Sequence, residues 1–268
     1  MVQEGEPKSP TLSEREFQQA ESYIIVKAAP RASQKFGETV CIAGLNLDGS
    51  WARLYPVSFR DLEDAQRFGR WDKLRYRWRR PSGRSDVRDE SRRVDPHSIE
   101  IVGKMPLKER NGFLSRVAVT SLKKEFEQGK SLALLKPEII DFYIKKKSDD
   151  EFYKEIEIRE VLKAQADLFV RQNVIPSNPC PYSFHYRYRD EDGVHDGTCQ
   201  DWETEATFLR RKFESGEEQA IVWMKNMFGT VYPEKGLALA MGTHRYRADQ
   251  WLINGVVRLD EESQTSLF

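Results

Sequence analysis

A strict two-residue alternation in the segment Trp71–Arg80 constrains the fold more than any other feature of the sequence. Its large apolar residues fall on one side, namely Leu74, Tyr76 and Trp78. Its arginines fall on the other side, namely Arg75, Arg77 and Arg79. Side chains alternate between the two faces of a β-strand, so the segment is predicted to be a half-buried strand with an aromatic core face and a cationic outer face. The segment Tyr182–Arg189 shows the same alternation.

Short strands on either side of Trp71–Arg80 extend the β prediction. Tyr23–Lys27 is apolar, and Glu38–Asn46 and Ser50–Tyr55 bracket Asp48-Gly49, a strong hairpin signal. Arg60–Phe68 is expected to form a short helix, Pro81–Val94 an Arg-rich loop, and Ser98–Lys104 a strand that closes the sheet. Residues 21–105 are therefore predicted to form a small, strongly curved, barrel-like β domain.

The remainder of the chain mixes helices and strands. Helices are predicted over Val117–Gln128, Glu155–Gln172, the segment from the Asp201 cap to Phe213, and Glu217–Phe228. Strands are predicted over Ile139–Lys146, Leu237–Gly242 and Trp251–Arg258. The class is α+β, with a mobile arm (1–20), the β domain (21–105), an α+β domain (106–259) and an acidic linker with a terminal peptide (260–268).

Positive charge is concentrated in one part of a chain whose formal net charge is zero. Between Arg67 and Arg93 there are ten Arg and one Lys against four acidic residues. Arg offers bidentate donors to phosphate oxygens, and a strand spaces residues on one face by roughly 6.6 Å. We therefore predict contact with nucleic acid through one set of side chains: Arg53, Arg70, Arg75, Arg77, Arg79, Arg80, Arg84, Arg88, Arg187, Arg189 and Trp71. A solvated face or an internal salt-bridge network is the alternative.

Two thiols and two imidazoles form a candidate zinc site. The residues are Cys180, His185, His195 and Cys199. Thiolate and imidazole are the ligands that tetrahedral zinc prefers, although neither pair has the tight spacing of a zinc knuckle. The alternative is two buried or incidental thiols, with His185 on the basic face of its strand.

His195, Asp201 and Glu203 form a candidate catalytic set. A histidine with carboxylates can hold Mg²⁺ or Mn²⁺ and activate water for phosphodiester cleavage. No complete nuclease signature accompanies them, and helix N-termini attract carboxylates without any catalysis. A catalytic role and a purely structural role are therefore both open for these three residues.

The last five residues form the sharpest motif. Gln264-Thr265-Ser266-Leu267-Phe268 follows the acidic stretch Asp260–Glu262 and resembles the bacterial sliding-clamp-binding motif of Gln, two variable positions, Leu and Phe. The resemblance implies that Leu267 and Phe268 enter an apolar cleft on the clamp and that Gln264 fills a polar subsite. Alternatively, the two apolar side chains fold back onto the protein's own core. The run Glu38–Val57 resembles an uncharacterised bacterial family of no known activity.

Composition limits the location of the protein. No stretch approaches 18 apolar residues, and the first twenty residues lack the apolar centre of a signal peptide. With three cysteines, we expect a cytoplasmic protein with reduced thiols and no membrane partner.

Three classes of function remain open. The first is a DNA-binding protein recruited to the sliding clamp in repair or replication. The second is a metal-dependent nuclease with the same recruitment. The third is an RNA-binding or defence-associated protein.

Overall fold

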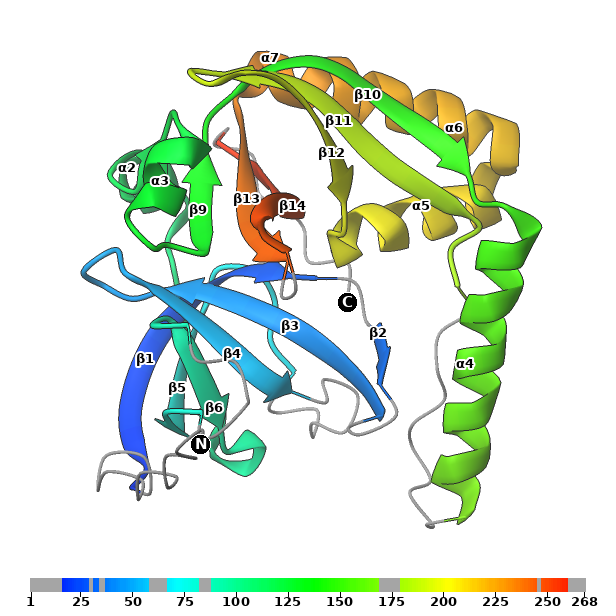
Figure 1. Ribbon diagram of the computed structural model, residues 1–268. Coiled ribbons are helices and arrows are strands. Elements are labelled where there is room, and N and C mark those ends of the chain that lie inside the picture. Colours follow the sequence, from blue (N-terminus) through cyan, green and yellow to red (C-terminus); the bar gives the residue numbers. More distant parts are fainter. Residues whose placement is uncertain are drawn as a thin grey trace, which may run out of the picture.

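The computed structural model describes residues 16–28, 31–33, 37–57, 67–81, 88–168, 179–244 and 247–259 (Figure 1). Helices and strands both contribute extensively, so the predicted α+β class is confirmed. Within these residues no helix is both long and apolar enough to cross a membrane. The proposed terminal peptide at 260–268 and most of the proposed arm lie outside the described residues.

Five strands of the N-terminal part close into a barrel. They are β1 (Gln18–Lys27), β3 (Gly37–Leu45), β4 (Trp51–Val57), β5 (Asp72–Arg79) and β6 (Ser91–Val94). The order around the barrel is β1-β3-β4-β6-β5, and β5 pairs again with β1. Two further strands extend it: β2 (Arg31–Ser33) pairs with β3, and β7 (Glu100–Lys104) pairs with β5. The predicted barrel-like domain is therefore confirmed.

The order of the barrel strands is that of a known Greek key. Every neighbouring pair is antiparallel except β4 and β6, which run parallel. Among the five barrel strands in chain order, the first (β1) therefore pairs with the fourth (β5), and the third (β4) lies beside the fifth (β6). The OB-fold has the same arrangement, and its barrels bind oligonucleotides or oligosaccharides. A fold alone does not establish a function, so the surface residues have to decide it.

The hairpin between β3 and β4 forms where Asp48-Gly49 predicts it. Leu45 lies opposite Trp51, and Gly49 adopts a φ of +85°, which a residue without Cβ reaches at no steric cost. The Asp48 carboxylate accepts hydrogen bonds from the backbone and the hydroxyl of Ser50, at 2.9 and 2.6 Å. Local chemistry therefore fixes this turn.

Alternation along β5 supplies the barrel with its aromatic interior. Leu74 and Tyr76 are fully buried, and Trp78 packs against the same cluster, as the two-residue period predicts. The other strands contribute mainly aliphatic side chains. The cluster comprises Ile24, Ile42, Ala52, Leu54, Val57, Phe68, Leu74, Tyr76, Val94 and Ile99.

A second seven-stranded sheet forms the rest of the molecule. Its strands are β8 (Ala118–Val119), β9 (Leu132–Leu135), β10 (Glu138–Lys146), β11 (Tyr182–Asp190), β12 (Gly193–Cys199), β13 (Leu237–His244) and β14 (Arg247–Arg258). They are arranged in the order β10-β11-β12-β14-β13-β9-β8. Only a single residue pair, Cys199 with Ile253, links β12 to β14, and that pairing is parallel.

The helices and helical turns of the described residues are η3 (Pro96–Ser98, a 3₁₀ turn), α2 (Leu107–Ser115), α3 (Leu122–Glu127), α4 (Asp149–Leu168), α5 (Trp202–Ser215), α6 (Glu217–Asn226), η4 (Met227–Val231, a π-helical turn) and α7 (Tyr232–Lys235). Of these, α5, α6 and η4 pack against one face of the second sheet, whereas η3 lies between β6 and β7 and contacts β5. Phe208 of α5 and Met224 of α6 are fully buried against the aromatic face of β11. That face again follows the predicted alternation, with Tyr182, Phe184, Tyr186 and Tyr188 buried.

A third apolar cluster joins the barrel to the second sheet. Ile25 and Val26 of β1 pack with Leu134 of β9 and Ala240 of β13. Trp71 and Phe113 complete the cluster from the following segments. Because this cluster is fully buried, the two parts share one core rather than meeting at a wet interface.

Several predicted boundaries are wrong. The segment expected as a helix over 117–128 begins with β8, and only Leu122–Glu127 is helical. The expected Arg-rich loop contains β6. The helix expected from Glu155 starts six residues earlier, at Asp149. Most of the expected helix Arg60–Phe68 lies outside the described residues.

Candidate functional site

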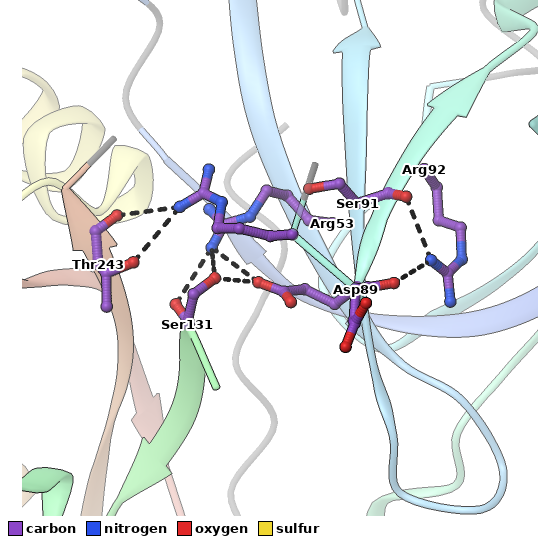
Figure 2. A network of polar contacts seen from close by, with 8 residues as sticks. Arg53, Asp89, Ser91, Arg92, Ser131 and Thr243 are labelled. Atoms are coloured by element: carbon purple, nitrogen blue, oxygen red, sulfur yellow. Dashed lines mark hydrogen bonds and ion pairs between the residues drawn. The ribbon is translucent and has the colours of Figure 1, made fainter. Parts of the chain in front are cut away.

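Three of the predicted nucleic-acid contacts are buried, and this part of the prediction is wrong. Arg53 and Arg70 are only 8% and 6% exposed, and Trp71 is 1% exposed. The Arg53 guanidinium donates to the Ser131 carbonyl and hydroxyl, both at 3.1 Å, and pairs with Glu90 at 3.4 Å (Figure 2). Arg53 therefore links the barrel to the residue before β9, and its buried guanidinium group is not accessible to a ligand.

Arg70 forms the centre of a second buried polar cluster between the barrel and α5. Its guanidinium pairs with Asp201 at 3.2 Å and Glu203 at 3.0 Å, and it also donates to the Val256 carbonyl. Lys27, 2% exposed, donates to the Phe68 carbonyl at 3.3 Å. Burial lowers the pKa of Lys27. We call Lys27, Arg70, Asp201 and Glu203 the junction cluster.

Burial dominates the titration of Asp201. Loss of solvation raises the pKa of Asp201 to about 7, the Arg70 charge opposes this rise, and the nearby Glu203 adds to it. The Thr204 hydroxyl donates to the same carboxylate at 3.0 Å. Asp201 is the residue before α5, as predicted, but its side chain does not bond to the helix backbone as a cap.

Backbone strain accompanies Arg70. The next residue, Trp71, has a φ of +71°, a left-handed conformation that is rare for a bulky side chain. Its amide donates to the Ile24 carbonyl at 2.7 Å, and its carbonyl accepts from Met105 at 2.9 Å. These two bonds and the buried ring hold the turn that directs Arg70 toward Asp201.

The candidate catalytic set does not assemble. His195 lies on β12 with its Nε2 2.8 Å from Asp190 Oδ1, whereas Asp201 and Glu203 both pair with Arg70. Among the described residues, which include all three, no group of His, Cys, Asp or Glu side chains is arranged to hold a metal ion. The prediction of a Mg²⁺ or Mn²⁺ centre at these residues is therefore wrong.

The candidate zinc site is wrong for a geometric reason. On β11 and β12, Phe184 lies opposite Cys199 and His185 opposite Thr198, so Cys199 and His185 point to opposite faces of the sheet. Cys199 is buried, while the His185 ring stacks on Tyr143 at 5.0 Å. Burial raises the pKa of the Cys180 thiol to about 12 and that of Cys199 further, so neither is a ready thiolate.

Two arginines of the outer β5 face are neutralised by neighbouring acids. Arg75 pairs with Glu21 of β1 at 2.8 Å and with Glu100 of β7 at 3.5 Å. Arg77 pairs with Asp95 at 2.5 Å. These contacts match the salt-bridge alternative for this part of the face.

The two arginines predicted on β11 lie apart from the barrel. Arg187 is exposed and lies opposite Asp196 of β12, and Arg189 pairs with Glu138 at 2.7 Å. Figure 1 shows β11 at the other end of the molecule from β5 and β6. A single continuous surface therefore does not join them to the β5 arginines.

A group of arginines without a described acidic partner lies at the end of β5 and along β6. Arg79 lies opposite Arg93, and Arg93 lies beside Tyr55 of β4, so a cross-strand row runs over the outer barrel surface. Arg80 follows Arg79 and is exposed. Within the described part of the chain, no acidic side chain pairs with Arg79, Arg80 or Arg93. We call Tyr55, Arg79, Arg80 and Arg93 the arginine row.

Aromatic rings border the arginine row. The Arg79 guanidinium lies 5.4 Å from the centre of the Phe17 ring, which is 46% exposed. Arg92 lies 3.9 Å above Trp78 and donates to the carbonyls of Asp89 and Ser91 (Figure 2). Burial lowers the pKa of Arg92, and nearby Arg80 adds to this effect. Phe17 thus offers exposed aromatic surface beside the row, whereas Trp78 packs against the barrel interior.

Two further predicted contacts, Arg84 and Arg88, belong to the segment between β5 and β6. Arg84 lies outside the described residues. Arg88 donates to the carbonyl and hydroxyl of Thr243, at 3.2 and 3.4 Å. The side chain of Arg88 therefore links the residues before β6 to β13.

Sequence reasoning missed Arg93, Tyr55 and Phe17. The signal for Arg93 was present in Ser91–Val94, where buried ends flank Arg92 and Arg93, but only four residues carry it. Tyr55 follows from the alternation of β4, whose Ala52 and Leu54 are buried. Phe17 precedes β1 and had no periodic context.

Two family models match the chain. The model described as Domain of unknown function (DUF8758) matches residues 18–119, which include the barrel. The model described as Domain of unknown function (DUF8757) matches residues 115–268, which include the second sheet. No curated protein matches the chain.

Proposed function

The chain belongs to the DUF8757 family, and we propose that it is a DNA-binding protein that holds single strands on the outer surface of its barrel. The arginine row carries the proposal. It offers three exposed or partly exposed guanidinium groups that no described acid neutralises, on a barrel with the strand order of an oligonucleotide-binding fold. Uncompensated guanidinium groups are the side chains best suited to phosphate oxygens.

The aromatic border supports a single strand over a duplex. Bases of a single strand are free to stack on exposed rings, at about 1–3 kcal/mol per base, whereas paired bases are not. Phe17 lies directly beside Arg79, and Tyr55 is a neighbour of Arg93 across the strands. A backbone that follows the arginines would therefore place bases near both rings.

The structure of the junction cluster favours a binding role over nuclease activity. Both candidate catalytic carboxylates pair with Arg70, and Asp201 is only 2% exposed. A carboxylate in that environment cannot reach a phosphodiester. We therefore favour a non-enzymatic accessory factor that acts in DNA repair or replication.

Direct binding measurements test the proposal. We expect a labelled single-stranded DNA of about 20 nucleotides to bind more tightly than the matched duplex, with an affinity that falls steeply with salt. Fluorescence anisotropy with DNA, duplex and an RNA of the same sequence separates the outcomes. Stronger binding to RNA would favour the RNA-binding alternative, and no binding to any of them at low salt would contradict the proposal.

Recruitment to the sliding clamp is the second part of the proposal. The support is the match of Gln264–Phe268 to the clamp-binding pattern after an acidic stretch. Burying Leu267 and Phe268 would contribute roughly 3–5 kcal/mol before ordering costs, which suits an exchangeable tether. Action on the clamp in turn implies a cytoplasmic location beside bacterial DNA.

Removal of the last two residues should abolish clamp binding. The expected result is loss of association with purified clamp in surface plasmon resonance, because Leu267 and Phe268 carry nearly all the apolar area of the peptide. Single-stranded DNA binding and the unfolding temperature should stay unchanged, since neither residue belongs to a periodic core pattern of the sequence. An unfolded truncation would show instead that the two side chains belong to the core.

A further inference from the structure

The outer strand of the second sheet has one free edge. β10 is the first strand in the sheet order and, among the described strands, pairs only with β11. It is nine residues long, while the strand at the opposite end of the sheet, β8, has two. Figure 1 shows β10 along the outer margin of the sheet. A long edge strand offers a row of backbone donors and acceptors to another chain.

Nothing in the described part of the chain covers this edge with backbone hydrogen bonds. The one turn bond nearby joins the Lys147 amide to the Pro181 carbonyl, on the β11 side. The strand is also rich in residues that favour strands, with Ile139, Ile140, Phe142, Tyr143 and Ile144. Ile140 is 42% exposed.

We propose that two copies of the chain pair in antiparallel fashion through β10, with Tyr143 at the two-fold axis. Residues 141–145 of one copy then lie opposite residues 145–141 of the other. This would join two seven-stranded sheets into one continuous sheet with closed two-fold symmetry, the commonest symmetry of protein assemblies.

The outward face of β10 is complementary to itself in this register. Asp141, Tyr143 and Lys145 share that face, since they lie opposite Arg187, His185 and Ser183 of β11. Antiparallel pairing about Tyr143 brings Asp141 of each copy opposite Lys145 of the other, so both pairs are of opposite charge. Opposite charges at directly facing positions stabilise paired strands, and like charges destabilise them.

The inward face is complementary as well. Phe142 is buried and Ile144 partly buried on the side that packs on α6 and η4. In the same register Phe142 of one copy lies opposite Ile144 of the other, which continues the apolar face across the junction. The irregularity between Ile139 and Asp141 falls outside the paired residues 141–145, so it does not interrupt them.

Charged residues on an edge strand often prevent it from pairing with another chain, but the order of the charges along β10 favours pairing with a second copy. A strand with lysines alone would repel its own copy in any antiparallel register. In β10 a negative residue lies two positions before Tyr143 and a positive residue two positions after it. The two-fold operation therefore matches opposite charges rather than like ones.

A charge-exchange experiment tests the proposal with the full chain. Sedimentation equilibrium should show wild-type protein in a concentration-dependent equilibrium with a species of twice the 31.3 kDa chain mass. Asp141→Lys and Lys145→Asp should each weaken self-association by about tenfold or more, because each brings two like-charged pairs together. Mixing the two single variants should restore association, since every facing pair in the mixed dimer is again of opposite charge.

Folding controls and three contrary results decide whether the two copies associate through β10. Asp141 and Lys145 are both exposed, so thermal unfolding of Lys145→Asp should match wild type and exclude misfolding as the cause. Asp141→Lys also places a second positive charge opposite Arg187 of its own β11, so this variant should stay folded but unfold at a slightly lower temperature. Wild-type protein that stays monomeric at high concentration would overturn the proposal. Single variants that dimerise as wild type does, or a mixture that fails to associate, would also overturn it.

Discussion

Replacing Arg70 by methionine is expected to lower the free energy of unfolding by about 3–5 kcal/mol, because it leaves a buried carboxylate without its partner. Asp201 and Glu203 both pair with this guanidinium, and the Val256 carbonyl accepts from it. Chemical denaturation at pH 7 measures the loss. If Arg70 instead served DNA binding, the variant would keep its stability and lose affinity.

A surface arginine provides the matched control. Arg77→Met also removes one ion pair from a neighbouring position, but the Arg77 side chain is 60% exposed. Exposed pairs contribute about 0–1 kcal/mol, so this variant should stay within about 1 kcal/mol of wild type. Equal losses in the two variants would show that the burial of Arg70 has no energetic consequence.

The pH dependence of stability provides a second check on the same cluster. The pKa of Asp201 is raised to about 7 in the folded protein, so between roughly pH 4 and pH 7 the folded state binds a proton that the unfolded state has released. This stabilising contribution is complete at low pH and is lost as the pH rises through 7. Asp201→Asn should remove that part of the profile measured between pH 5 and 8.

The sequence predicted the local elements better than their assembly. The alternation in β5 and β11 reports which face of each strand is buried, and burial follows it at Leu74, Tyr76 and Tyr186. Closure of the barrel depends on pairings between distant segments, such as Arg53 with Ser91 in the parallel β4–β6 pair. No local pattern encodes that pairing.

Arginines of different roles look alike in the sequence. Arg70 and Arg79 belong to the same basic stretch, yet Arg70 meets an aspartate 131 residues away, while no described acid pairs with Arg79. Only the fold decides which acids reach which arginine. Burial and pairing therefore divide the predicted set of arginines into those with a structural role and those on which the proposal rests.

The metal predictions failed because spacing alone ignores the alternation of strands. Cys199 and His185 lie on adjacent strands, as a ligand pair would, but on opposite faces of the sheet. The same two-residue period that located the strands argues against the site once the register is known. A histidine and cysteines near one another in sequence are weak evidence for zinc in such a segment.

Removing two charges from the arginine row is expected to weaken single-stranded DNA binding by about 30-fold at 0.1 M salt, if each guanidinium contact contributes about 1 kcal/mol. The variant is Arg79→Gln with Arg93→Gln. Both residues face outward in a cross-strand pair and have no described acidic partner, so folding should be unaffected. Thermal unfolding checks that assumption.

The control variant removes two positive charges from a different surface. Arg187→Gln with Arg189→Gln changes two outward-facing residues of β11, at the other end of the molecule (Figure 1). Its affinity for single-stranded DNA should stay within about twofold of wild type, apart from a small effect of net charge. An equal loss in both double variants would mean that the binding surface extends to β11.

The dependence of affinity on salt tests the central claim most directly. Each lost phosphate contact on a single strand lowers the slope of log K against log salt by about 0.7. The account predicts that Arg79→Gln with Arg93→Gln reduces that slope by about 1.4 and that Arg187→Gln with Arg189→Gln leaves it unchanged. A folded Arg79→Gln, Arg93→Gln protein with the wild-type slope would contradict the assignment of the arginine row as the DNA-binding surface.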